Sequence, residues 1–173
     1  RGSRIIAGEN IVLTQPFMPK IVNVDQYHCG PIHGPTGANP LNIVNKGICV
    51  SKEKTERFTD EGQTYVQMSR DTAAKTKDNW AFMIVDDDVH NLKVLANDWN
   101  SYARNRAPVY KADTIEDLAK QAGLDPKKLA KIVKDYNAAN DNNTRGKLVP
   151  PNTLPKAYPV KKAPFYAVPF QGG

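Results

Sequence analysis

Short apolar runs alternate with turn-forming residues along the first half of the chain. Residues 4–24 hold three such runs separated by Gly and Pro, a pattern typical of short strands or extended segments. In residues 28–40 Gly and Pro are so dense that a structured loop is expected. Residues 47–51 are strand-like and residues 57–59 are their predicted return, which together indicate a hairpin. A near-continuous apolar run over residues 80–85 predicts a buried strand.

Apolar residues spaced three or four positions apart predict two helices in the middle of the chain. The first covers residues 63–76 and the second residues 91–105. The apolar positions are Tyr65, Met68, Thr72 and Ala73 in the first helix and Leu92, Leu95, Trp99 and Tyr102 in the second.

Two further helices are indicated by residues that begin or end helices. Asp113 or Thr114 can cap the first of them, and Gly123 can terminate it. Asp125 followed by Pro126 is an N-cap with proline at the first helical position, so a second helix begins there.

The end of the chain completes the predicted fold. Residues 139–164 are rich in Asn and Pro and predict an irregular excursion, and residues 165–170 predict a last strand. Together these elements predict an α+β domain, with a small mixed sheet flanked by helices. At 173 residues the chain has the length of one domain.

Charge and cysteine content narrow the function classes. The chain carries 24 Lys and Arg against 18 Asp and Glu, but the basic residues are spread along it, so a solvated surface is favoured over a nucleic-acid patch. The two cysteines, Cys29 and Cys49, form no CxxC motif. Asp86, Asp87 and Asp88 are interpreted as a solvated strand end instead of a cation site. No membrane span or signal peptide is evident, and the compartment is left open.

Several motifs follow one another in an order that is similar to one family. The chain resembles, over roughly residues 20–173, the substrate-capping domain of bacterial fumarate reductase/succinate dehydrogenase-type flavoproteins. The resemblance rests on six segments: residues 47–51 (GICVS), 56–61 (ERFTDE), 69–71 (SRD), 80–86 (WAFMIVD), 113–137 (with DTIEDLA and GLDP) and 163–168 (APFYAV).

The resemblance implies that FAD is bound by a separate domain of the same protein. The chain contains no G-x-G-x-x-G fingerprint for a dinucleotide. We therefore expect a cap fragment without cofactor, inactive alone, with residues 1–40 as a loop-rich leading segment from the missing FAD domain and residues 41–173 as the cap core. Its expected partners are a small carboxylate substrate and that FAD domain, with no nucleic acid.

The same resemblance assigns the candidate site residues. Arg70 matches the family's catalytic arginine, which supplies a proton while hydride passes between the flavin and a substrate C–C bond. An arginine is an unusual acid because its reference pKa is above ~12, so it needs neighbouring charges and a proton relay. His28 matches a histidine that binds a substrate carboxylate, and His33 competes with it for that role. No third metal ligand accompanies the two histidines, so no metal site is expected.

Departures from the family pattern limit the prediction of substrate. The classical enzymes carry Thr-Glu and a nearby Arg between this histidine and the hairpin, whereas residues 39–43 read NPLNI. The substrate is therefore expected to be an acid other than fumarate. Arg57 and Glu61 are interpreted as a structural ion pair. Two other interpretations stay open: a free-standing small-acid or partner-binding module without flavin, and a basic nucleic-acid-binding protein.

Overall fold

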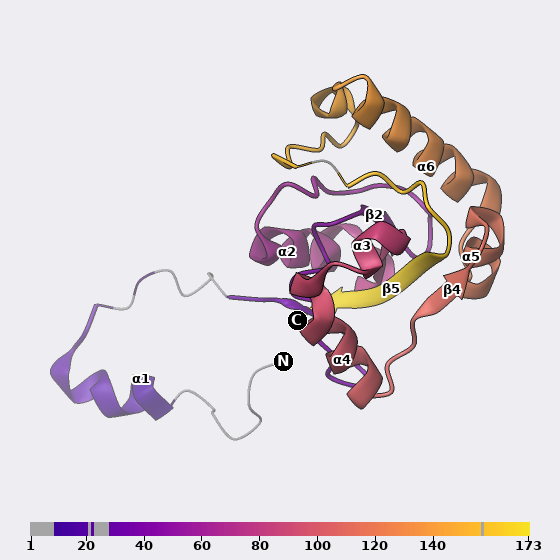
Figure 1. Ribbon diagram of the computed structural model, residues 1–173. Coiled ribbons are helices and arrows are strands. Elements are labelled where there is room, and N and C mark those ends of the chain that lie inside the picture. Colours follow the sequence, from indigo (N-terminus) through magenta and orange to yellow (C-terminus); the bar gives the residue numbers. More distant parts are fainter. Residues whose placement is uncertain (1–8, 21, 23–27, 157) are drawn as a thin grey trace.

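The computed structural model describes residues 9–20, 22, 28–156 and 158–173, and its centre is a five-stranded sheet (Figure 1). The order across the sheet is β2, β3, β5 and β1, with β4 also paired to β5. The strands are β1 (Pro31–Ile32), β2 (Ile48–Ser51), β3 (Ala81–Val85), β4 (Tyr110–Ala112) and β5 (Phe165–Gly172).

Every strand pairing in the described residues is antiparallel. The predicted α+β class is therefore confirmed, but the sheet is antiparallel and not mixed as predicted. The last strand causes this arrangement, because β5 lies between β3 on one side and β1 and β4 on the other, running opposite to all three. No parallel neighbours remain that would need a crossover connection.

Helices of different lengths connect and cover the strands. Four of them contain eight residues or more and carry most of the helical packing. The α-helices are α1 (Glu9–Thr14), α2 (Tyr65–Lys75), α3 (Asp87–His90), α4 (Ala96–Arg104), α5 (Ile115–Ala122) and α6 (Pro126–Asp141). The short 3-10 helices are η1 (Gln15–Phe17), η2 (Lys77–Asn79), η3 (Lys93–Leu95) and η4 (Arg145–Lys147).

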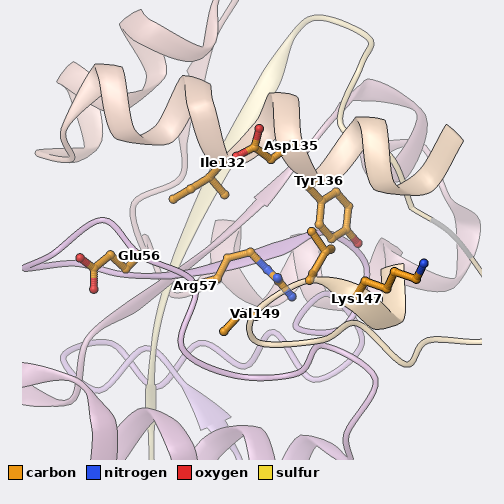
Figure 2. Close-up of a pocket in the computed structure, with 8 residues that line it drawn as sticks. Glu56, Arg57, Ile132, Asp135, Tyr136, Lys147 and Val149 are labelled. Carbon is orange, nitrogen blue, oxygen red and sulfur yellow. The ribbon is translucent and has the colours of Figure 1, made fainter. Parts of the chain in front are cut away.

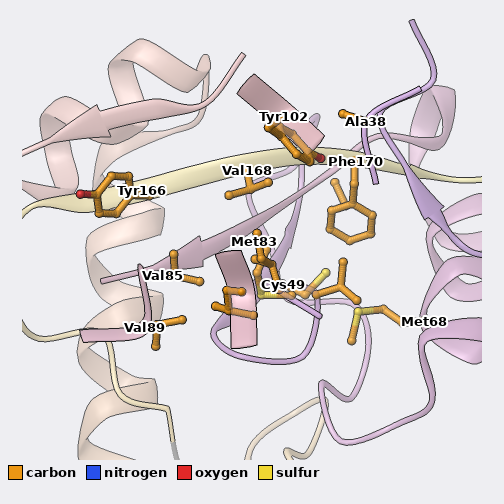
Figure 3. Packing of buried hydrophobic residues seen from close by; sticks show 14 residues of the cluster. Ala38, Cys49, Met68, Met83, Val85, Val89, Tyr102, Tyr166, Val168 and Phe170 are labelled. Carbon is orange, nitrogen blue, oxygen red and sulfur yellow. The ribbon is translucent and has the colours of Figure 1, made fainter. Parts of the chain in front are cut away.

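The sheet is covered on both faces, which explains why its central strands are apolar without interruption. Alternate residues of β3 belong to separate cores: Met83 faces the core that contains residues of α2, α3 and α4 (Figure 3), and Phe82 faces the core of α5 and α6. Large side chains such as Phe170 and Leu129 fill these cores. The two-sided burial confirms the buried strand predicted over residues 80–85.

The residues predicted to begin and end the two helices of the second half are confirmed, and the choice between Asp113 and Thr114 as a cap is settled. Thr114 caps α5 by accepting a hydrogen bond from the Asp117 N–H, so Thr114 and not Asp113 is the N-cap. Gly123 ends α5 with a left-handed φ of 70°, which glycine adopts without steric cost. Asp125 caps α6 through the N–H groups of Lys127 and Lys128.

The strand interpretation of the first segment is wrong where the structure describes it. Residues 9–14 form α1, and the apolar runs at residues 5–6 and 21–24 lie, apart from Val22, outside the described residues. A run of only three apolar residues does not distinguish a helix from a strand by its period. The predicted loop over residues 28–40 is largely confirmed, with the short strand β1 inside it.

The return strand predicted over residues 57–59 is reduced to one isolated bridge between Val50 and Arg57. The side chain of Arg57 is drawn into the core toward Glu61, so the chain turns inward after the bridge. The other neighbour of β2 is β3, which provides its regular pairing.

Asp86 corrects the prediction of a solvated strand end. Its side chain is 2% exposed and accepts hydrogen bonds from the backbone N–H groups of Val89, Lys161 and Lys162. It therefore begins α3 and fastens the segment before β5 to the end of β3. Only the following two aspartates are accessible, and both pair with Lys162.

Candidate functional site

Arg70 lies in helix α2, next to the end of β5. Thr64 caps the helix, and Met68 is buried in the core beneath it. The end of β5 packs so closely against the helix that a Cβ at Gly172 would overlap the carbonyl oxygen of Ser69. Arg70 follows Ser69 directly and is half-buried. This packing fixes the backbone position of Arg70.

A carboxylate next to Arg70 in sequence is held ionised. Asp71 is buried and accepts hydrogen bonds from Thr59 Oγ1 at 2.7 Å, Gln67 Nε2 at 3.0 Å and Lys75 Nζ at 3.0 Å. Burial opposes ionisation, but these hydrogen bonds outweigh it and lower the pKa of Asp71. The bonds also fix the turn of α2 that carries Arg70.

His28 lies against the same helix. Its Nε2 atom is 3.2 Å from the hydroxyl of Tyr65, and the two rings meet edge to face at 5.7 Å. The residues after His28 are tied down, because Cys29 Sγ contacts the Val66 carbonyl and the backbones of Gly30 and Gly173 exchange two hydrogen bonds. The imidazole itself is exposed and is available to a ligand.

His33 occupies a different environment. It is 5% exposed, its Nδ1 is 2.8 Å from Thr36 Oγ1, and its ring contacts those of Trp80 and Tyr102. Burial lowers the pKa of His33, which favours the neutral ring. These contacts stabilise the turn after β1. His28 contacts Tyr65 of the helix that carries Arg70, whereas His33 contacts Trp80 and Tyr102. A substrate role for His33 stays a prediction.

A hollow of about 500 Å³ lies between α6 and the segment around η4 (Figure 2). Arg57 points into this region, and Ile132 and Tyr136 of α6 line it. The guanidinium of Arg57 donates to Glu61 through Nε and Nη2 and to the carbonyl oxygens of Pro150 and Pro151. Because these bonds occupy most of its N–H donors, Arg57 holds the Pro150–Pro151 segment against Glu61. The hollow shares no residue with the surroundings of Arg70.

Arg57 and Glu61 form the predicted structural ion pair, which is buried, with side chains 6% and 0% exposed. Glu61 also accepts from the Cys49 N–H and from Asn152 Nδ2, which in turn donates to the hydroxyl of Tyr136. Burial disfavours the charged form of Arg57, but the hydrogen bond and charge of Glu61 outweigh it and raise the pKa of Arg57. Sequence reasoning missed Asn152, which is 91 residues from Glu61 and carries no motif.

The N-termini of α2, α4, α5 and α6 carry groups that compete with a bound pyrophosphate. A pyrophosphate needs unoccupied N–H groups at such an end. Thr64, Thr114 and Asp125 already accept those N–H groups in α2, α5 and α6. The first turn of α4 holds the carboxylate of Asp98, which repels an anion.

The described residues contain neither a cluster of metal ligands nor a membrane-spanning helix. Within the described ranges, no group of three or more His, Cys, Asp or Glu side chains is arranged to hold a metal ion. No helix among these residues is long and apolar enough to cross a membrane.

The antiparallel sheet with helices on both faces is the α+β fold of a flavoprotein cap domain. No protein-family model matches the chain. Over 165 residues it is 25% identical to the probable fumarate reductase Ifc3 of Shewanella frigidimarina. The aligned region covers 91% of this chain and 27% of that protein. The chain thus spans about a quarter of the length of this curated relative.

Solved structures show the same fold. The open conformation of a flavocytochrome c3 fumarate reductase matches 96% of this chain and 28% of its own, with a TM-score of 0.70 and 21% identity. A 3-ketosteroid Δ1-dehydrogenase from Sterolibacterium denitrificans matches 95% of this chain and 34% of its own, with a TM-score of 0.65 and 20% identity.

A third structure consists almost entirely of the shared fold. It is the solution structure of a fumarate reductase flavoprotein subunit from Lactobacillus plantarum, which matches 81% of this chain and 94% of its own, with a TM-score of 0.52 and 19% identity. A domain of this fold therefore exists in solution by itself. The chain resembles a domain-sized part of fumarate reductase- and dehydrogenase-type flavoproteins.

Proposed function

We propose that this chain is the substrate-capping domain of an FAD-dependent oxidoreductase that acts on a small carboxylic acid. One observation carries the proposal: α2 holds a half-buried arginine, and an exposed histidine contacts the same helix through Tyr65. The similarity to fumarate reductase-type flavoproteins supports it. The FAD and the redox step belong to segments outside this chain, and the isolated chain is inactive.

Arg70 and His28 divide the work of binding and proton transfer. The exposed imidazole of His28 binds one substrate carboxylate by donating a hydrogen bond. Arg70 neutralises the negative charge that develops on the substrate and supplies the proton to its carbon. The packing of Ser69 against Gly172 and the bonds of Asp71 hold the helix still, because positional error is costly in such a site. The NPLNI segment in place of Thr-Glu and Arg favours an acid other than fumarate.

Steady-state kinetics of the longer protein with a panel of small unsaturated carboxylic acids test this proposal. His28→Ala is expected to raise KM about tenfold for the accepted acid with little change in kcat, since it removes one carboxylate contact worth ~1.5 kcal/mol. His90→Phe is the matched control, because His90 stacks on Tyr166 elsewhere in the fold. Equal KM values for His28→Ala and the unsubstituted protein would rule out the assigned role of His28.

A further inference from the structure

A small aromatic slot lies at the end of the sheet nearest Trp80. Its volume is about 110 Å³. This is less than the about 150 Å³ of a dry apolar cavity that holds benzene, but the slot is open to solvent, so one ring can enter it with an edge left outside, whereas a fused pair is too large. Its lining residues are His33, Lys52, Trp80, Phe82, Pro108, Tyr110, Ala122 and Pro169.

The slot is separate from the surroundings of Arg70. Phe82 belongs to the core of α5 and α6, whereas Met68 of α2 belongs to the core on the opposite face of the sheet. Pro169 faces Phe82 across the β3–β5 pairing, and Tyr110 contacts Phe82 edge to face at 6.0 Å. The proposed substrate site and this slot are therefore on different faces.

The walls of the slot suit the edge and face of an aromatic ring. Trp80, Phe82 and Tyr110 offer π surfaces, and edge-to-face pairs of this kind gain energy beyond the area that they bury. The ring of His33 meets Trp80 edge to face at 5.4 Å, so Trp80 is already held in one orientation. A planar ring entering the slot meets preformed walls and requires little rearrangement.

One cation stands at the slot. Lys52 Nζ lies 5.6 Å from the centroid of the Trp80 ring, and Lys52 is the single charged residue among the lining residues. None of the ion pairs of the described residues involves Lys52. Lys52 and Trp80 also line an adjoining open hollow of about 560 Å³, whose other charged residues are Glu53, Lys77 and Asp78. This hollow leaves room for the chain that links a ring to an acid group.

We propose that this slot is a second ligand site, which binds a monocyclic aromatic carboxylate with its ring between Trp80 and Tyr110 and its carboxylate on Lys52. The ring supplies the apolar contact, and the lysine selects an acid over a neutral aromatic compound. The site goes beyond the proposed capping function and does not depend on it, because it uses neither Arg70 nor His28.

Trp80 itself reports on the site, because the chain contains only two tryptophans. The Trp99→Phe variant leaves Trp80 as the single fluorophore. Titration of this variant with 3-phenylpropionate is expected to change the Trp80 fluorescence saturably. Lys52→Gln in that background should weaken binding about fivefold, the effect of one partly exposed ion pair. Lys93→Gln is the matched control, since it removes an exposed lysine from η3, and it should bind as the Trp99→Phe parent does.

Two further ligands separate the contributions of ring and charge. The neutral amide of 3-phenylpropionate should bind about fivefold more weakly than the acid, and succinate should leave the Trp80 signal unchanged because it has no ring. Absence of a saturable change with 3-phenylpropionate would overturn the proposal. Equal binding of acid and amide, or equal weakening by Lys52→Gln and Lys93→Gln, would overturn the role of Lys52.

Discussion

Glu61→Gln is expected to lower the free energy of unfolding by about 3–5 kcal/mol, the usual cost of removing one partner from a buried ion pair. The substitution preserves the shape of the side chain and removes its charge. Arg57, whose side chain is 6% exposed, is then left without its ion-pair partner. Such a loss is a large fraction of the 5–15 kcal/mol that typically stabilises a domain.

The loss spreads because Glu61 joins distant parts of the chain. It accepts hydrogen bonds from β2 through Cys49, from Arg57, and from Asn152 in the irregular excursion. Arg57 in turn donates to the carbonyl oxygens of Pro150 and Pro151. Weakening this network therefore loosens residues 145–154 as well as the strand.

Urea denaturation followed by circular dichroism measures this effect. Asp117→Asn is the matched control, because it neutralises one partner of an exposed pair with Lys120 and should leave the free energy of unfolding nearly unchanged. The double variant Arg57→Met/Glu61→Leu should lose less than Glu61→Gln alone, since it leaves no unpaired charge. If Glu61→Gln and Asp117→Asn cost the same, the buried pair does not hold the fold as described.

Arg70→Gln in the longer flavoprotein is expected to lower kcat by about 10²–10⁴-fold, the range typical of a lost general acid. Glutamine has no positive charge and no proton to give, although it keeps a hydrogen-bonding side chain at the same place. Asp71 stays ionised next to it and holds the helix turn, so the defect belongs to the side chain of Arg70. KM should change far less than kcat, because the interaction is made mainly in the transition state.

Parallel measurements show whether the effect is chemical. Arg104→Gln on the exposed end of α4 is the matched control and should retain kcat within about twofold. The flavin content of both variants is measured by absorbance, so that loss of cofactor is not mistaken for loss of the acid. If Arg70→Gln retains kcat within tenfold of the unsubstituted enzyme, Arg70 is not the proton donor.

Elements that depend on local sequence were predicted well. The apolar run of β3, the capping residues of α5 and α6 and the strand β5 all appear at the expected positions. Each has a signal within a few residues, such as Asp125 before Pro126. The order of the strands has no such signal, because the position of β5 between β3 and β1 depends on packing between segments more than 80 residues apart.

The candidate site was predicted only in part for the same reason. The ion pair of Arg57 and Glu61, which follow the predicted hairpin, was expected, but nothing local indicated that Asn152 would complete it. The sequence also left His28 and His33 as competitors. The structure separates them through contacts that no spacing reveals, with His28 beside Tyr65 of α2 and His33 buried against Trp80.

The most direct test of the central claim is a visible absorption spectrum of the purified chain, recorded alone and again after addition of FAD and desalting. We predict that the proposed capping domain binds no flavin, since the N-termini of α2, α5 and α6 carry their own caps. We therefore expect no flavin band in either spectrum. A band corresponding to one flavin per chain would show that these residues build a cofactor site, and it would contradict the assignment of the chain as a cap separate from the FAD-binding domain.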